Sequence, residues 1–386
     1  MQLLLKWVLI TAAVIQTVKA EFDLALYGPY EYYTSSPITP RPWPNQFETF
    51  FPNNNRLLTN ISTGVCNLTL RDYHAAFEAP HGSVEARKML SICNRHEACI
   101  YGQLVPSITL NYQGASIFLG LAPYILSTLG PTVAKLSVLS VHRPLLAFLI
   151  SLGAPVSTPV HVFDFDDPRD LLRDKARKLV IDRIDYRVAL LISVIQYVLA
   201  GLAATNVIST MIAVGQNTTL AWACTTQFAP LLWVVLASFV AVVAMVGTLM
   251  IKWTYPPGNS RLGVSSAHVK RLVNIGCVPW LFAHTLRNMG DAVRSEITVC
   301  ANTTDRAFCR GIEKHTKLPK LAVFLHIAAG CMSFVLFLFG TAVFSALQLV
   351  TFIDAFARII ARLIASSVIC RLILIFELAG LRGAGP

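Results

Sequence analysis

Three long apolar runs constrain this chain more than any other feature of its sequence. They cover residues 188–210, 231–251 and 321–350, and none of them contains Asp, Glu, Lys or Arg. Each exceeds the roughly 20 residues that an α-helix needs to cross the hydrocarbon core of a bilayer. Only 14% of the 386 residues are charged, well below the share in soluble domains, because these runs carry no charge. The sequence therefore predicts a multi-pass membrane protein.

A fourth span is expected over residues 108–129, with a kink at Pro123. The apolar stretch that follows, 145–152, is too short to cross a bilayer, so we expect it to return or to lie in the interface. His142 and Arg143 come just before this stretch, at membrane depth. Polar groups are costly in lipid, which makes both residues candidates for a function, although anchoring at the headgroups is the simpler alternative.

The amino terminus has the pattern of a cleavable signal peptide over residues 1–20. It contains Lys6, an apolar core from residue 7 to residue 15, and small side chains at Val18 and Ala20. Cleavage after Ala20 would leave residues 21–105 as a domain on the lumenal or extracellular side. The segment from 27 to 52 is rich in proline, which favours an extended arm.

Glycosylation motifs support this orientation. Asn60-Ile61-Ser62 and Asn67-Leu68-Thr69 both fall in the expected lumenal domain, and Asn217-Thr218-Thr219 falls in a loop without Lys or Arg. We therefore expect glycans on Asn60, Asn67 and Asn217.

The cysteines of the same domain are expected to form disulfides. Cys66, Cys93 and Cys99 are an odd number, so a fourth partner is needed, and Cys224 in the loop after residue 210 is the leading candidate. An alternative is a zinc site, because Cys93, His96 and Cys99 would share one face of a helix. An oxidising lumen favours disulfides over this site.

The basic loops indicate which side is cytoplasmic. Residues 161–187 contain seven Lys and Arg residues, and residues 252–320 contain eleven. Both loops are expected in the cytoplasm by the positive-inside rule. A motif at Asn302, between Cys300 and Cys309, instead resembles a lumenal glycosylated loop and leaves a fifth crossing open.

The carboxy-terminal segment 351–386 is predicted as an amphipathic helix on the membrane surface or against the bundle. Asp354 and Arg358 stand four residues apart, in the favourable order for an ion pair. Glu377 in this segment and His326 in the span 321–350 complete the set of candidate functional polar residues. The overall expectation is an all-α membrane protein. It comprises a bundle of about four transmembrane helices over 106–350, a re-entrant or interfacial segment, and a small disulfide-bearing lumenal domain.

The sequence contains none of the common catalytic or phosphate-binding motifs, and no cofactor or metal is expected. The net charge of +11 comes mainly from the loops, without the basic and aromatic mixture of a nucleic-acid surface. Expected partners are the lipid bilayer and other membrane or cell-wall components. The favoured hypothesis is a non-enzymatic surface sensor, scaffold or interaction protein in the plasma membrane or another secretory-pathway membrane. The alternative is a transporter or membrane-embedded enzyme that serves a biosynthetic cluster.

Several stretches together resemble a family of multi-pass membrane proteins of filamentous fungi. They are residues 115–123, 143–146 continuing to 153–155, 222–224, 230–233, 340–341 with 344–345, 370–371 and 376–382. The resemblance implies a fungal origin and a signal peptide followed by a small helical bundle. It implies no activity, and no functional residue is transferred from it.

Overall fold

The protein is mostly helical and divides into two compact units. The computed structural model describes residues 46–78, 89–155, 185–222, 224, 228–254, 296, 299–300 and 319–383. The first unit comprises the chain up to Thr109 together with Gln216–Thr218, and the second comprises Leu110–Gly215 together with Thr219–Pro386. The expected signal peptide over 1–20, most of the proline-rich arm and most of both basic loops lie outside the described residues.

The first unit is a small helical domain closed by a disulfide. Its elements are α2 (Asn55–Asn60), a π-helical turn η1 (Ile61–Val65), α3 (Asn67–Glu78) and α5 (Met89–Gly102). Cys66 follows η1 and is bonded to Cys99 on α5. The core is aromatic: Phe47 packs edge-on against Tyr73 and against the His96 ring, with centroids 5.2 and 4.6 Å apart. Burial raises the pKa of Tyr73, whose hydroxyl donates to Gln46 over 2.8 Å.

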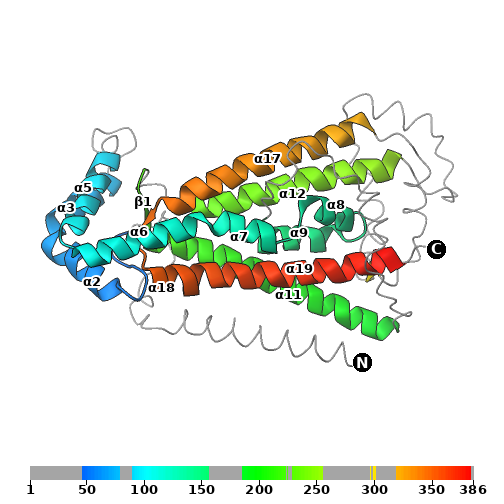
Figure 1. The fold of residues 1–386 in the computed structure, drawn as a ribbon, viewed down its shortest axis with the longest axis horizontal. Coiled ribbons are helices and arrows are strands. Elements are labelled where there is room, and N and C mark those ends of the chain that lie inside the picture. The colour runs from blue at the N-terminus through cyan, green and yellow to red at the C-terminus, as the bar shows by residue number, and fades with distance from the viewer. Residues whose placement is uncertain are drawn as a thin grey trace. The chain divides into compact units, whose positions relative to one another are not determined.

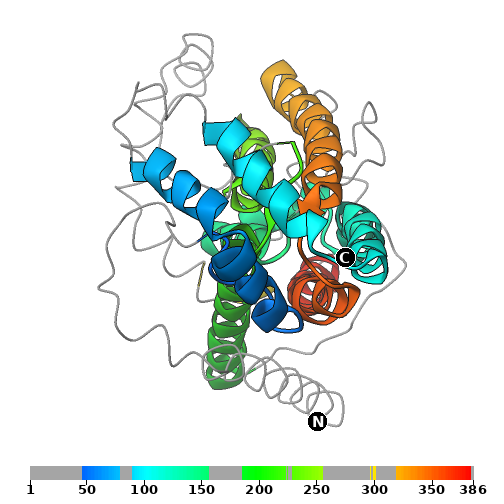
Figure 2. The same cartoon turned by 90° about the vertical axis from the view of Figure 1, so that its left-hand side faces the viewer.

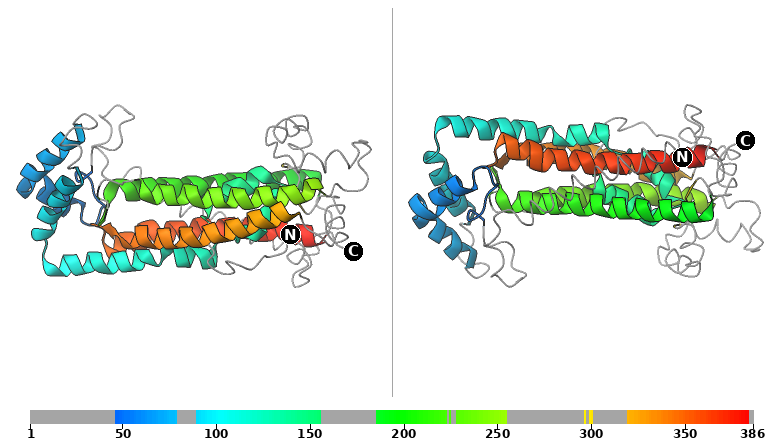
Figure 3. Two further views of the ribbon diagram at one scale, coloured as in Figure 1. Left: turned by 90° about the horizontal axis from the view of Figure 1, so that it is seen from above. Right: turned by 90° about the horizontal axis from the view of Figure 1, so that it is seen from below.

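The second unit is built on four helices that are long and apolar enough to cross a membrane. They cover Arg187–Asn217, Ala229–Ile251, Lys320–Ser345 and Phe352–Ala379. The corresponding elements are α11 (Tyr186–Asn217), α12 (Ala229–Thr254), α17 (Lys320–Ser345), and α18 (Phe352–Asp354) continued by η4 (Ala355–Ile360) and α19 (Ala361–Gly383). Figures 1 and 3 show these helices side by side along their length, and Figure 2 shows them end-on. This composition indicates a membrane protein.

A short antiparallel ladder identifies one end of the bundle. Strand β1 (Thr219–Leu220) follows α11 and pairs with β2 (Leu347–Gln348), which follows α17. The end of α11, the start of α12, the end of α17 and the start of α18 therefore lie at one end, called here the strand end. The opposite end, called the loop end, holds Tyr186, Thr254, Lys320 and Gly383.

A bent helix pair passes along the bundle beside these four helices. It comprises α6 (Pro106–Gly120), α7 (Ala122–Leu129) and α8 (Val133–Ser140), with a bend of 50° before α8. Near the strand end, the Asn111 side chain accepts from Phe352 N over 2.8 Å. Val141, just after α8, packs with Ile251 and Ala322 at the loop end. The pair thus passes from one end of the bundle to the other, and this is the expected span at 108–129 extended by α8.

Helix α9 (Pro144–Gly153) reaches only the middle of the bundle. A Cβ atom on Gly153 would lie 3.0 Å from Ala203 Cβ and 2.9 Å from Cys370 Sγ, so the α9 backbone touches α11 and α19 directly. Ten residues of helix rise only about 15 Å, half of a hydrocarbon core. The structure therefore has the expected stretch at 145–152 as a half-helix inside the bundle.

Close contact between α12 and α17 depends on one glycine. A Cβ atom on Gly340 would lie 2.9 Å from Trp233 Cε2, so no larger residue fits without movement. The Trp233 indole donates to Leu336 O over 3.1 Å and packs edge-on against Phe344. Small residues at helix contacts are typical of membrane bundles.

The carboxy-terminal segment differs from expectation. The sequence predicts an amphipathic helix over 351–386, whereas Phe352–Ala379 is apolar enough to span and packs against α7, α8 and α9. The ion pair expected between Asp354 and Arg358 is present, with 3.2 Å between Oδ1 and Nε. The physical reason for the difference is that the charged side chains of this helix have partners within the protein.

Candidate functional site

A fully buried ion pair forms the centre of the candidate site. Arg143, the residue before α9, and Glu377, near the end of α19, have no exposed surface. Arg143 Nη1 donates to Glu377 Oε1 over 2.9 Å. The two residues are 234 positions apart in the chain. Both are sequence candidates, and the structure brings them together.

Arg143 is also bonded to two other segments. Its Nη1 donates to Gln196 Oε1 over 2.5 Å, and its Nη2 donates to Ser193 Oγ over 2.6 Å, both on α11. Its Nε donates to the Glu296 carbonyl over 3.1 Å. The planar guanidinium, with donors in fixed directions, suits such simultaneous bonding better than an ammonium group.

The Glu377 carboxylate is surrounded by donors. Besides Arg143, Gln196 Nε2 donates to Oε1 over 2.6 Å, and the Cys300 backbone N–H donates to Oε2 over 3.0 Å. A buried charge is tolerated only when it is paired and hydrogen-bonded. Glu377 meets this condition through three donors from three segments.

Glu296 adds a second carboxyl group beside the pair. Its Oε1 accepts from Leu145 N, in the first turn of α9, over 2.7 Å. The Tyr197 hydroxyl bonds to its Oε2, and the Arg143 guanidinium lies 5.1 Å from the centre of the Tyr197 ring. A carboxylate at a helix N-terminus is favourable because the unpaired N–H groups and the helix dipole both attract it.

This polar cluster, defined here as Arg143, Ser193, Gln196, Tyr197, Glu296 and Glu377, lies near the loop end. Ser193 stands seven residues after the start of α11, and Glu377 stands six residues before the end of α19, which places both about 10 Å from that end. The cluster joins the start of α9 to α11, to α19 and to the segment of Glu296. Chemically it is a closed clamp, because Arg143 and Glu377 are bonded to each other and the Glu296 carboxyl group is bonded to Leu145 N and the Tyr197 hydroxyl.

The remaining sequence candidates lie elsewhere. His142 is buried and has an interaction partner, whereas the contacts to the cluster are made by its neighbour Arg143. His326 on α17 is hydrogen-bonded through Nε2 to Thr248 Oγ1 on α12 over 3.0 Å. Its ring also packs on Gly247. The structure therefore gives His326 a role in helix packing that is separate from the clamp.

Arg371, also on α19, has a structural role. Its Nη1 donates to the carbonyl groups of Thr128 and Leu129 over 2.6 and 3.1 Å. These carbonyls belong to the last turn of α7 and have no partner within the helix. A cation at this position also complements the helix dipole.

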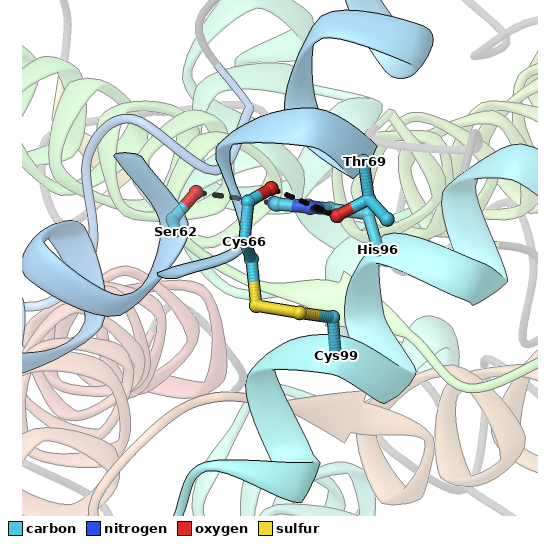
Figure 4. The surroundings of a disulfide bond; sticks show 5 residues. All are labelled: Ser62, Cys66, Thr69, His96 and Cys99. Carbon is cyan, nitrogen blue, oxygen red and sulfur yellow. Dashed lines mark hydrogen bonds between the residues drawn. A yellow bond between two sulfur atoms is a disulfide. The ribbon is translucent and has the colours of Figure 1, made fainter. Parts of the chain in front are cut away.

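The first unit contains a second polar cluster, shown in Figure 4. His96 Nε2 lies 3.1 Å from Ser62 Oγ, and His96 Nδ1 lies 2.8 Å from Thr69 Oγ1. Ser62 and His96 have no exposed surface. Burial, with a smaller repulsion from His74, lowers the pKa of His96 from 6.5 to about 4, so the ring is neutral near pH 7.

The four candidate cysteines are oxidised. Cys66 is bonded to Cys99, and Cys93 and Cys224 are each in a disulfide. The alternative zinc set fails because Cys99 is used by Cys66 and both ring nitrogens of His96 are hydrogen-bonded. Among the residues that the structure describes, no group of three potential metal ligands occurs.

The three candidate glycosylation sites differ in exposure. Asn60 and Asn67 are exposed, whereas Asn217 at the strand end is half-buried. Asn302 lies outside the described residues.

Sequence reasoning missed part of the polar cluster. Gln196 is visible in the sequence as an amide within the apolar run 188–210, whereas Ser193, Tyr197 and Glu296 carry no signal. Ser193 and Tyr197 are ordinary residues in an apolar helix, and Glu296 lies in a loop with many charges.

Comparisons with protein-family models, with curated proteins and with solved structures gave no match.

Proposed function

We propose that this chain is a multi-pass protein of a secretory-pathway membrane that acts by contact through its amino-terminal domain. The closed state of the Arg143–Glu377 pair carries this proposal. Arg143 and Glu377 are bonded to each other and have no exposed surface. Turnover generally needs an acid, base or nucleophile that a substrate can reach. The pair is better suited to holding α9 in position.

The Cys66–Cys99 disulfide supports a lumenal or extracellular position for the domain. Disulfides persist in oxidising compartments and are rare in the cytosol. Helical elements joined by such a bond keep a fixed surface, as an interaction domain requires. Other membrane proteins or cell-wall components are the proposed partners, with the lipid bilayer around the bundle.

The charge distribution supports a matching orientation of the bundle. Residues 252–320, with eleven Lys and Arg, connect α12 to α17 at the loop end, and residues 161–187, with seven, lead into α11 at the same end. The positive-inside rule favours the loop end as cytoplasmic. Asn217 and Cys224, at the strand end, would then face the lumen. This orientation makes α6–α8 a broken span and puts the carboxy terminus in the cytoplasm.

Glycan mapping tests the orientation. Expression in a eukaryotic host should give glycosidase-sensitive mobility shifts that are lost on Asn60→Gln and Asn67→Gln. Asn302→Gln should leave the mobility unchanged, because its loop is cytoplasmic under this proposal. Amino-terminal sequencing should begin at Glu21. A glycan on Asn302, or an intact Met1, would contradict the orientation.

A second candidate function is transport, favoured by α9. A half-helix with a charged residue at its N-terminus is typical of substrate and ion sites in transporters. In this protein the N-terminus of α9 faces Glu296, and Arg143 faces Glu377.

Complementation of a deletion strain separates the two functions. The double variant Arg143→Met/Glu377→Leu removes the charges together, so that neither remains buried alone. If contact is the function, this variant should complement when its abundance and localisation are normal, whereas deletion of residues 46–102 should not. A correctly localised double variant that fails to complement would replace contact by transport.

A further inference from the structure

The two glycosylation motifs of the first unit share one histidine. Ser62 is the hydroxyl residue of the motif at Asn60, and Thr69 is the hydroxyl residue of the motif at Asn67. Their oxygen atoms bond to opposite nitrogens of the His96 ring, over 3.1 and 2.8 Å (Figure 4). The hydroxyl groups of both motifs are therefore hydrogen-bonded to the same buried side chain, His96.

The direction of these bonds follows from Thr69. Its hydroxyl donates to the Cys66 carbonyl over 2.8 Å, so its oxygen accepts from His96 Nδ1–H. With the ring neutral, Nε2 carries a lone pair and accepts from the Ser62 hydroxyl. Each hydroxyl proton is thus used within the domain.

In each motif the asparagine side chain faces solvent, whereas the hydroxyl side chain faces the interior of the domain. Asn60 and Asn67 are exposed, whereas Ser62 is fully buried and Thr69 is half-buried. Residues two apart on a helix do not share a face. An enzyme that recognises Asn-x-Ser/Thr must contact the amide and the hydroxyl together. The folded domain exposes the asparagine amide of each motif but not the hydroxyl group.

The disulfide fixes this arrangement. Cys66 lies between the two motifs, and its bond to Cys99 joins them to the helix that carries His96. Opening of either motif requires the helical turn around Cys66 to unwind. The bond to α5 opposes this unwinding by holding the turn against His96.

We propose that Asn60 and Asn67 accept N-glycans only before this domain folds, and that the His96 contacts together with the Cys66–Cys99 bond close both motifs afterwards. In the transfer, the asparagine amide nitrogen bonds to the anomeric carbon of a lipid-pyrophosphate-linked oligosaccharide. The bond from that carbon to the pyrophosphate oxygen breaks, the lipid pyrophosphate leaves with the electron pair, and the amide gives up one proton to a base of the transferase. The proposal rests on the proposed lumenal orientation for its role in cells, but the closure itself is a property of the folded chain.

A reconstituted reaction tests the closure without reference to orientation. Full-length protein from a host that lacks N-glycosylation is purified in detergent, oxidised and offered to oligosaccharyltransferase with its lipid-linked donor. A peptide of residues 57–72 serves as the unfolded reference because it contains both motifs. Site occupancy is measured by mass spectrometry. The oxidised chain should react at least about tenfold more slowly than the peptide at both sites, because only opened molecules react. The same chain reduced and unfolded should react at a rate close to that of the peptide.

Matched variants assign the closure to His96. His96→Ala should raise occupancy at both asparagines in oxidised protein that retains the Cys66–Cys99 bond in a non-reducing digest. His74→Ala is the control, because this half-exposed histidine of α3 pairs with Glu48 and does not contact either hydroxyl. If His96→Ala protein loses the bond, Ser62→Thr and Thr69→Ser provide the second test, since both keep the motifs and should react as slowly as wild type.

The results separate failure of the closure from failure of the orientation. Equal rates for oxidised chain and peptide would overturn the closure, as would a peptide that is not modified at all. Slow modification of the oxidised chain, combined with Asn60 and Asn67 that stay bare in cells even in the His96→Ala variant, would support the closure and contradict the lumenal orientation.

Discussion

Replacing Arg143 by methionine leaves the Glu377 carboxylate buried without its cationic partner. The variant also removes the donors to Gln196, Ser193 and the Glu296 carbonyl, because a thioether supplies none of them. Breaking a fully buried ion pair by removing one partner costs about 3–5 kcal/mol. For a folding unit of a few hundred residues, this corresponds to a drop in Tm of roughly 6–20 °C.

The surface pair Arg95–Asp72 provides a matched control. Its atoms are as close, at 2.5 Å, but the two side chains are 59% and 54% exposed. Exposed pairs of this kind contribute about 0–1 kcal/mol. Arg95→Met should therefore change the Tm far less than Arg143→Met, although both remove one arginine.

The double variant Arg143→Met/Glu377→Leu measures the pair itself. It removes both charges, so it should recover about 1–3 kcal/mol of the loss caused by Arg143→Met alone. The remaining deficit reflects Gln196 and the Cys300 N–H, which lose their partners. The assay is the fraction of detergent-purified protein that stays monodisperse after heating. If Arg143→Met unfolds at the same temperature as Arg95→Met, or the double variant is no more stable than Arg143→Met, the clamp is not what holds this end of the bundle.

Further predictions concern packing, pH and disulfides. Gly340→Ala should destabilise the bundle by about 1–3 kcal/mol in thermal unfolding, because the new methyl group meets the buried Trp233 indole. Gly201→Ala is the control and should not destabilise the bundle, because no atom lies within 4 Å of a Cβ placed there. Equal effects of the two substitutions would contradict this packing. His96 has a folded-state pKa of about 4 against 6.5, so its contribution of roughly 3 kcal/mol is complete above pH 6.5 and is lost as the pH falls towards 4. Hydrogen exchange of the domain at pH 4–7 measures this loss, and a His96→Phe variant with the same pH dependence would contradict it. A non-reducing digest should give one cross-linked peptide joining Cys93 to Cys224, because each is in a disulfide and Cys66 and Cys99 are bonded to each other, and a free thiol at either position would refute it.

Apolar runs predict where helices lie because length and lack of charge are local properties. The runs at 188–210, 231–251 and 321–350 fall within α11, within α12 and largely within α17. The sequence predicts that the stretch at 145–152 is too short to cross a bilayer, and α9 indeed has only 10 residues. These inferences need no knowledge of what each segment packs against.

Partners distant in the chain are not visible in the sequence. The sequence predicts an amphipathic helix over 351–386 because Asp354, Arg358 and Arg362 line one face, while the continuation is apolar except for Arg371 and Glu377. In the structure Arg358 pairs with Asp354, Arg371 bonds to the last carbonyls of α7, and Glu377 pairs with Arg143. A hydropathy scale counts every charged residue as unfavourable within an apolar helix. Only the fold shows which partners compensate each charge.

His96 shows the same limit within the first unit. Its spacing from Cys93 and Cys99 placed three possible ligands on one helix face. The alternatives for these side chains were a disulfide to Cys66 and two hydroxyls on another element, and spacing along one helix says nothing about them.

The separation of Arg143 from Glu377 sets an order for biosynthesis. A ribosome adds about 5–20 residues per second, so roughly 10–50 seconds pass between synthesis of the two residues. Throughout this interval α9 has its guanidinium but not the carboxylate that neutralises it. The pair is therefore completed only after the 234 positions that separate the two residues have been translated, and a chain that stops before Glu377 retains an unsatisfied charge within the bundle. Such a charge distinguishes an unfinished chain from a finished one, and it gives membrane quality control a physical feature to detect.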